Sequence, residues 1–320
     1  MTHPTNCRWK FCRMAAIVAA FAIVLSATAP ALATDLKWTF KAGKSHRYRL
    51  ETKTTTELKL PGQTIKTTML QATETSWNVR SVDEKGDAEI ALKFERFQIQ
   101  ADTPQGRIAY DSLAEKPPGG LLGATIGPTY KALAGSTFVY NMTPQGEVRD
   151  IRIPGDVVAR LKEAVETSGD APRFSEEGYK ELVRDQNLQF PARDLKQGDC
   201  WTRQTRIGSP TGVHLHEKTY TYAGLDEKTH AETIRMSVQV KLEPTSNPAL
   251  DVKIDGQQDN ATYLFDNQDG HLLESCRAQT SKVIYTLKAG PRGGQAYTEN
   301  KTVESSLKLV ETRTGTVASK

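Results

Sequence analysis

From Trp38 to about Tyr110 the chain alternates between apolar and polar residues with a period of two. In HRYRLETKTTTELKL, residues 46–60, one parity carries Tyr, Leu and Thr, and the other carries Arg, Glu and Lys. This pattern predicts a long strand with one covered and one solvated face, and the LPGQ that follows predicts a turn into a return strand. The third strand, AEIALKFERFQI, changes parity near Glu95 and Arg96, which predicts a β-bulge that bends the sheet.

The middle of the chain changes to the apolar spacing of amphipathic helices. GGLLGATIGPTYKALAG, from Gly119, has this spacing, although Pro128 is expected to interrupt it. GDVVARLKEAVETSG carries one apolar stripe, and FSEEGYKELVRDQ begins with Ser175 as a predicted N-cap followed by two acidic residues. Between these helices, GSTFVYNMTPQGEVRDIRIP predicts a hairpin. Each helix has a stripe to bury, and the concave face of a curved sheet is the expected partner.

After Pro191 the strand pattern resumes in TIRMSVQVKL, in the hairpin ATYLFDNQDGHLLESC, and in KVIYTLK and TVESSLKL. The second half also resembles the first. FKAGKSHRYRL at Phe40 matches LKQGDCWTRQT at Leu195 in pattern, and TFVYNMTPQGEV matches TYLFDNQDGHLL. An internal duplication and a simple recurrence of strand pattern both explain this. The string TPQG, which occurs at 103–106 and at 143–146, is interpreted as two hairpin turns.

These patterns predict an α+β fold that is predominantly antiparallel β. We expect long curved sheets or half-barrels with two to three amphipathic helices packed against them, in one domain or two. The predicted divisions are a signal peptide at 1–33, a first antiparallel region at 34–118, a helical segment with a hairpin at 119–190, a second antiparallel region at 191–310 and a disordered tail at 311–320.

The first 33 residues have the pattern of a signal peptide. Arg8, Lys10 and Arg13 form a positive region, AAIVAAFAIVL is an apolar core, and Ala31-Leu32-Ala33 suits a signal peptidase. The alternative is an uncleaved anchor, but the apolar run is shorter than the about 20 residues that span a bilayer. The sequence therefore predicts a periplasmic or extracellular protein with no transmembrane span after cleavage.

Removal of the signal peptide leaves the chain almost neutral. The full chain has 42 Lys and Arg against 38 Asp and Glu. Three of the basic residues lie in the signal, so 42 − 3 = 39 basic residues remain against 38 acidic ones. A nucleic-acid-binding protein usually carries a basic patch or stripe, so we expect no nucleic acid as a partner.

Cys7 and Cys12 leave with the signal, so Cys200 and Cys276 remain. An oxidising compartment permits them to pair, and we predict a disulfide over the alternative of two free thiols. The bond requires their Cα atoms to lie within about 7 Å.

The metal candidate is His214-Leu215-His216, because residues two apart on a strand point to one face. A zinc site needs further ligands, which His46, His230 or His271 would supply only if the fold brings them close. The alternative is a solvent-facing histidine pair.

DNQDG, at 266–270, resembles the start of a calcium loop but lacks the distal Glu, and a hairpin turn accounts for it. The sequence has no GxSxG, HExxH, P-loop or dinucleotide motif. We therefore predict no catalytic residue and no cofactor.

LKWTFKAGKSHRYRL, GQTIKTTM, FVYNMTPQGEVRDI, FSEEGYKELV, LKQGDCWTRQT and KTYTYAG together resemble a family of secreted bacterial proteins classed as a domain of unknown function. The resemblance covers roughly Leu36 to Leu309. It implies export and a β-rich fold, and it assigns no site residues.

Three functional hypotheses follow. The first is a noncatalytic exported protein that binds or carries a lipid or another apolar ligand in the cell envelope. The second is an envelope module that binds another protein through a sheet edge or face, and the third is a hydrolase with an unrecognised site.

Overall fold

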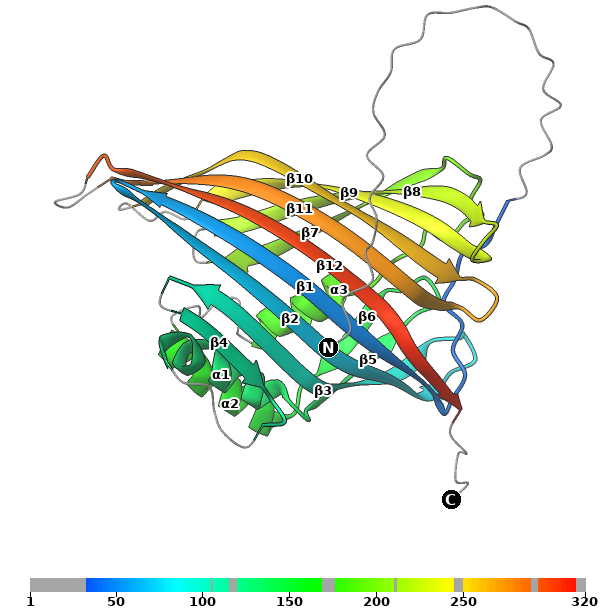
Figure 1. Cartoon of the computed structure of the whole chain (residues 1–320). Helices are drawn as coiled ribbons and strands as arrows, with labels where there is room; N and C mark the ends of the chain where they lie inside the picture. Colours follow the sequence, from blue (N-terminus) through cyan, green and yellow to red (C-terminus); the bar gives the residue numbers. More distant parts are fainter. Residues whose placement is uncertain are drawn as a thin grey trace, which may run out of the picture.

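The computed structural model describes residues 33–104, 106–114, 120–168, 176–209, 212–244, 250–288 and 293–314. Within them, twelve strands form one antiparallel sheet, so the two predicted β regions belong to a single layer (Figure 1). The strands are β1 (Lys44–Leu60), β2 (Gln63–Val82), β3 (Ala88–Thr103), β4 (Gly106–Asp111), β5 (Thr137–Met142), β6 (Val148–Arg152), β7 (Cys200–Ser209), β8 (Gly212–Asp226), β9 (Ala231–Pro244), β10 (Leu250–Asp266), β11 (His271–Leu287) and β12 (Ala296–Thr314). Figure 1 shows a strongly curved, open sheet, which confirms the predicted fold class.

The strand order is β6-β5-β3-β2-β1-β12-β11-β10-β9-β8-β7, with β4 paired to β3. Each half is a meander in chain order, and β12 lies between β1 and β11. The turns before β1 and β7 are alike: Gly43 N–H donates to Val79 O, and Gly198 N–H donates to Tyr222 O. This correspondence is what a duplication would produce, although recurrent turn chemistry would produce it too. The duplication stays a hypothesis.

The face of the sheet that carries Tyr48, Leu50 and Leu307 is called the inner face here, because Tyr48 belongs to the core. Side chains two apart on a strand share a face, so the register places each inner residue beside inner residues of the neighbouring strands. The predicted bulge is confirmed, since Glu74 pairs with Arg96 and Thr75 with Phe94, which leaves Glu95 as the extra residue.

The end of the sheet at which the N-terminus of the described chain lies, on the right of Figure 1, is called the closed end, and part of the core lies there. There the segment Leu36–Phe40, the N-terminal segment, runs between two hairpin turns. Trp38 N–H donates to Pro144 O of the β5–β6 turn at 2.8 Å, and Thr39 N–H donates to Gly270 O of the β10–β11 turn at 3.1 Å. The indole Nε1–H of Trp38 donates to Leu188 O at 2.9 Å. The N-terminal segment therefore ties both meanders together.

The other end of the sheet, where the β1–β2 and β11–β12 turns lie, is called the open end and is at the upper left of Figure 1. Towards it, β9 and β10 separate. Their pairing runs from Phe265↔Glu232 to Asn260↔Ser237, and no pair joins the rest of these two strands in the described residues. The facing backbone edges of β9 and β10 are therefore unpaired near the open end, apart from Val240 O, which accepts from Gln257 Nε2 at 2.9 Å.

Three helices are described: α1 (Gly120–Leu133), α2 (Gly155–Ser168) and α3 (Glu176–Gln186). α1 packs on α2 and on β4, whereas α3 packs against both β6 and β7, which are the two edges of the sheet. The interruption expected at Pro128 is wrong, because α1 continues through it. Burial of Thr129, Ala132 and Leu133 in the following turn offsets the hydrogen bond that proline cannot make. The predicted N-cap Ser175 lies outside the described residues, as does most of the predicted signal peptide.

The C-terminal end of α3 is held by cations from the sheet. Arg203 donates to Arg184 O at 3.1 Å, and Lys218 Nζ donates to Asp185 O at 3.0 Å and to its Oδ1 at 2.6 Å. Cations at this end of a helix satisfy carbonyls that have no partner inside the helix and complement its dipole. Burial lowers the pKa of Lys218, and Asp185 opposes this effect. The ion pair thus anchors the helix that lies between the two sheet edges.

Two local predictions have clear outcomes. Both TPQG strings form turns: Thr103 pairs with Gly106 between β3 and β4, and Gly146 N–H donates to Thr143 O between β5 and β6. The tail boundary is wrong, because β12 continues to Thr314, which pairs with Lys44. The alternation that predicts a strand fades in this polar stretch, and its partner β1 is remote in sequence.

None of the described helices is long and apolar enough to cross a membrane.

The two TPQG glycines give a matched test of the N-terminal segment. Both have positive φ, +119° at Gly106 and +84° at Gly146, but only a Cβ at Gly146 would meet other atoms, at 2.2 Å from Leu188 O and 2.8 Å from Trp38 Nε1. We expect Gly106→Ala to cost about 1 kcal/mol through backbone strain. Gly146→Ala should cost about 3 kcal/mol or more, because it also separates Trp38 from Leu188. Urea unfolding of both variants checks this, and equal losses would contradict it.

The ion pair of α3 gives a second test. Asp185→Asn leaves the Lys218 ammonium buried without its counter-ion and should cost about 3 kcal/mol of unfolding free energy. The double variant Asp185→Asn/Lys218→Met carries neither charge of the pair. Much of the unfolding free energy that Asp185→Asn loses should therefore be recovered in it. A double-mutant cycle by urea unfolding measures the coupling. Additive losses would show that the two side chains do not act as a pair.

Candidate functional site

A patch of apolar side chains lies on the inner face at the open end. Its members come from five adjacent strands and are all half-buried; they are Leu58, Ile65, Val252, Ile254, Val283, Tyr285 and Tyr297. The register joins them: Leu58 faces Ile65, Val283 faces Ile254, and Tyr285 faces both Val252 and Tyr297. None of them belongs to the buried core or packs against it in the described part of the chain. We call these seven residues the apolar patch.

A polar row separates the apolar patch from the core. One register step towards the closed end, the inner face carries Thr67, Thr56, Lys301, Ser281 and Gln257 across the same five strands. The alternation that fixes each strand's two faces therefore continues beyond the core. The patch is not an extension of the core, and apolar side chains gathered at a partly exposed surface are typical of a binding site.

Glu299 lies in the same cross-strand row as Leu58 and Val283. The hydroxyl of Tyr285 donates to its carboxylate at 3.5 Å. Burial, together with the charge of Glu299, raises the pKa of Tyr285 to about 12. The phenol is therefore neutral at physiological pH, and the patch combines apolar area with one polar contact point.

Two cavities of the described residues do not suit an apolar ligand. The one in the core, lined by Trp38, Tyr48, Trp77 and His271 among others, has a volume of about 10 Å³, which is the space of a single water. A larger hollow of about 250 Å³ is lined by Asp83, Asp87, Glu89, Arg149 and other polar residues. The open inner face, where the apolar patch lies, suits an apolar ligand better than either of these two cavities.

The predicted zinc pair lies on this face as well. His214 and His216 are on β8, with ring centroids 6.3 Å apart, and burial lowers the pKa of each. Among the described residues, one group of His, Cys, Asp and Glu is close enough to share a metal ion, and it includes neither of them. Zinc needs further ligands, which the described residues do not place within reach of this pair, so a zinc site at His214 and His216 stays a prediction.

The predicted disulfide is wrong. Neither Cys200 nor Cys276 is in a disulfide. Cys200 lies on β7 and Cys276 on β11, which are four strands apart in the sheet. At about 4.8 Å per strand the separation is roughly 19 Å, far more than a disulfide spans.

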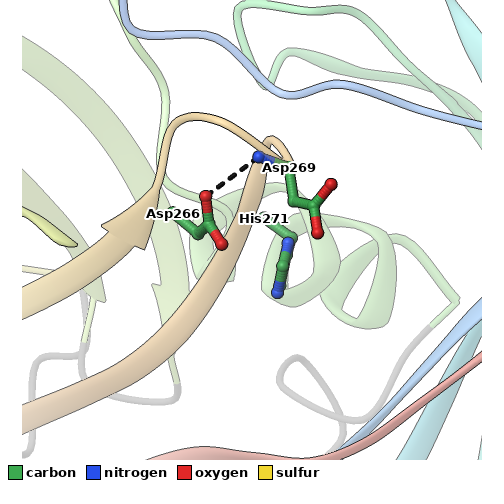
Figure 2. Close-up of side chains that lie close together, drawn as sticks. All are labelled: Asp266, Asp269 and His271. Carbon is green, nitrogen blue, oxygen red and sulfur yellow. Dashed lines mark hydrogen bonds between the residues drawn. The ribbon is translucent and has the colours of Figure 1, made fainter. Parts of the chain in front are cut away.

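The group that can share an ion comprises Asp266, Asp269 and His271 at the β10–β11 turn (Figure 2). Asp266 Oδ1 accepts from the Asp269 N–H at 2.9 Å. The His271 ring stacks on that of His46 with centroids 4.7 Å apart. From the sequence, DNQDG is predicted to be a turn, and His271 a further ligand of His214 and His216 if the fold brings it close. The spacing D-x-x-D-x-H was the available signal.

The family DUF6263, described as a family of unknown function, matches residues 85–272, which is more than half of the chain. No curated protein matches the chain.

Solved structures give distant likenesses. A lipovitellin, from a study of its lipid–protein interactions, has a TM-score of 0.48 and 12% identity over 88% of this chain and 26% of that one, so the chain spans about a quarter of the lipovitellin. The COG4313 outer membrane channel from Pseudomonas putida F1 has a TM-score of 0.20 and 8% identity. The match covers 84% of this chain and 97% of the channel. OccK2 (OpdF) from Pseudomonas aeruginosa, in complex with glucuronate, has a TM-score of 0.19 and 8% identity. The match covers 84% of this chain and 99% of that one. All three TM-scores lie below 0.5, so none of these likenesses assigns a function.

The stacked histidines predict how stability depends on pH. Burial, followed by the proximity of His271 and Lys44, lowers the pKa of His46 to about 4 from 6.5. Between these values the unfolded chain binds the proton and the folded protein does not, so stability is lost as the pH falls from about 6.5 to 4.

We expect the melting temperature of His46→Gln to depend less steeply on pH in this range than that of the unaltered protein. His230→Asn, at an exposed turn position, is the control and should leave the slope unchanged. Thermal unfolding monitored by circular dichroism at several pH values checks this. An unaltered slope in His46→Gln would contradict the assignment.

Proposed function

Because the chain belongs to DUF6263, a family of unknown function, we propose its function from its own geometry: it is an exported, noncatalytic protein that binds a lipid or another apolar ligand on its inner face. The observation that supports this most is the apolar patch. Its half-buried side chains are held side by side on one face by cross-strand pairing, next to a polar row. A surface of this kind is complementary to an elongated apolar molecule that has a polar end.

The apolar surface that a ligand would remove from water on the patch is enough for measurable affinity. A ligand that removes about 300 Å² of apolar surface from water gains roughly 7 kcal/mol before the costs of association, at about 25 cal/mol per Å². The patch is preformed by the sheet, so little ordering is required of the protein. An open surface also exchanges ligand faster than a closed pocket, which suits a carrier.

Export is supported by the basic, apolar and small-residue regions of 1–33. The place of action that we propose is therefore the cell envelope or the outside of the cell. N-terminal sequencing of the secreted protein should begin at Thr34, and retention of the leader would contradict the proposal.

A second candidate is an envelope interaction module. It is favoured by the separation of β9 from β10, which leaves two facing strand edges unpaired near the open end. Unpaired edges readily accept an added strand. Recovery of one stoichiometric protein partner from envelope extract, with no lipid in the purified protein, would favour this module over a carrier.

The carrier proposal is tested first on the unaltered protein. Protein purified without detergent should release lipid into an organic extract, as detected by mass spectrometry. It should also bind cis-parinaric acid or a pyrene-labelled phosphatidylcholine in solution. Absence of both lipid and probe binding would overturn the proposal.

β11 offers a matched pair of variants. Val283 is on the inner face and Ile284 is on the outer face, and both are half-buried. Val283→Lys places a charge in the apolar patch and should weaken cis-parinaric acid binding at least tenfold, whereas Ile284→Lys should change it less than twofold. Fluorescence titration measures both, with melting temperatures as a check on folding. Equal effects of the two substitutions would show that the inner face is not the binding surface.

A further inference from the structure

The β10–β11 turn holds two carboxylates and an imidazole that have no part in the apolar patch. From this geometry we propose a second site: Asp266, Asp269 and His271 bind a divalent transition-metal ion of the zinc type. The proposal does not depend on the ligand of the inner face.

The three ligand atoms can reach one ion after a side-chain rotation. Each residue offers one ligand atom, and these atoms lie within 4.8 Å of one another. Zinc bonds to nitrogen and oxygen are about 2.0–2.2 Å and zinc is usually tetrahedral, so ligand atoms on one ion are about 3.3–3.6 Å apart. Asp269 is exposed and can close the difference by side-chain rotation. Figure 2 shows the imidazole between the two carboxyl groups.

An unpartnered buried nitrogen supports the site independently. His271 is only 6% exposed, and its Nδ1 has no hydrogen-bond partner among the described residues. A buried polar atom without a partner is costly, so it calls for a ligand.

The turn is also held in a fixed shape. Gly270 has φ +64°, and a Cβ there would lie 2.2 Å from Thr39 N. Asn267 accepts from Lys37 N–H at 3.2 Å and donates to Asp35 O at 3.0 Å. The ligands therefore sit where the turn meets the N-terminal segment, and a bound ion would brace that contact.

The local charge allows a cation but moderates its affinity. Lys44 Nζ is 3.7 Å from Asp269 Oδ2 and Lys41 Nζ is 4.0 Å from Oδ1, both longer than a hydrogen bond. Two carboxylates outweigh the one nearly buried ammonium of Lys44, whereas the Lys41 side chain is 67% exposed and largely screened by solvent. Lys44 must nevertheless repel a metal ion. One nitrogen and two carboxylates favour zinc over calcium, which takes six to eight oxygen ligands.

The test is calorimetric titration of the purified protein with ZnCl₂, and separately with MgCl₂ and CaCl₂. We expect one zinc per chain with micromolar affinity, no comparable binding of magnesium or calcium, and a higher melting temperature with zinc. Zinc binding that is absent, or no tighter than that of magnesium and calcium, would overturn the proposal.

Three variants locate the site. Asp269→Asn should weaken zinc binding at least tenfold. The control is Asp226→Asn in the β8–β9 turn, where Asp226 accepts from the N–H groups of Lys228 and Thr229 in the same manner, but Thr229 replaces the second carboxylate. Asp226→Asn should leave the affinity for zinc unchanged. Lys44→Met should tighten zinc binding several-fold by removing the repelling charge. If Asp269→Asn binds zinc as the unaltered protein does, or Lys44→Met binds it more weakly, the site is not the one proposed.

Discussion

Trp38 makes the interaction on which the shape of the sheet depends. In the described part of the chain, the sheet of twelve strands is open, and its two meanders are joined through the sheet only at β12. The indole of Trp38 lies 5.8 Å from the ring of Trp77 on β2 and 5.2 Å from the ring of Phe265 on β10, and its Nε1–H donates to Leu188 O. One side chain thus contacts both meanders and the linker between them. This contact keeps one end of the sheet closed while the other end stays open.

The inner face follows from the same strands. At the closed end its residues meet the N-terminal segment and become core. Beyond the reach of that segment, the alternating pattern continues with threonine and serine in the polar row and then with the apolar patch. Threonine suits this intermediate zone, because it has high strand propensity and tolerates both water and apolar neighbours. Between β9 and β10 the ladder of backbone pairs stops short of the open end in the described residues, and Gln257 Nε2, which donates to Val240 O at 2.9 Å, joins the two strands there.

Local patterns predicted the local structure, and they did so where a short-range physical rule applies. A period of two gave the strands, the parity change gave the bulge at Glu95, and TPQG gave two turns. What failed was long-range. The pairing of β1 with β12 joins residues as remote as Lys44 and Thr314, and no local pattern encodes it. The separation of Cys200 from Cys276 depends on that same order of strands. The site shows the same division: His214 and His216 share a face as predicted, but the arrangement of Asp266, Asp269 and His271 depends on turn geometry and on the N-terminal segment.

The place of β12 between β1 and β11 has a consequence for how the chain folds. β1 ends at Leu60 and β12 ends at Thr314, so 314 − 60 = 254 residues are synthesised after β1 before its second neighbour is complete. At roughly 5–20 residues per second this interval is on the order of 10–50 s, during which one edge of β1 has no partner. An unpaired edge invites aggregation, and closing it late is slow because the contacts are so distant in sequence. The charged outer face of β1, with Arg49, Glu51 and Lys53, opposes self-association of the nascent chain throughout that wait.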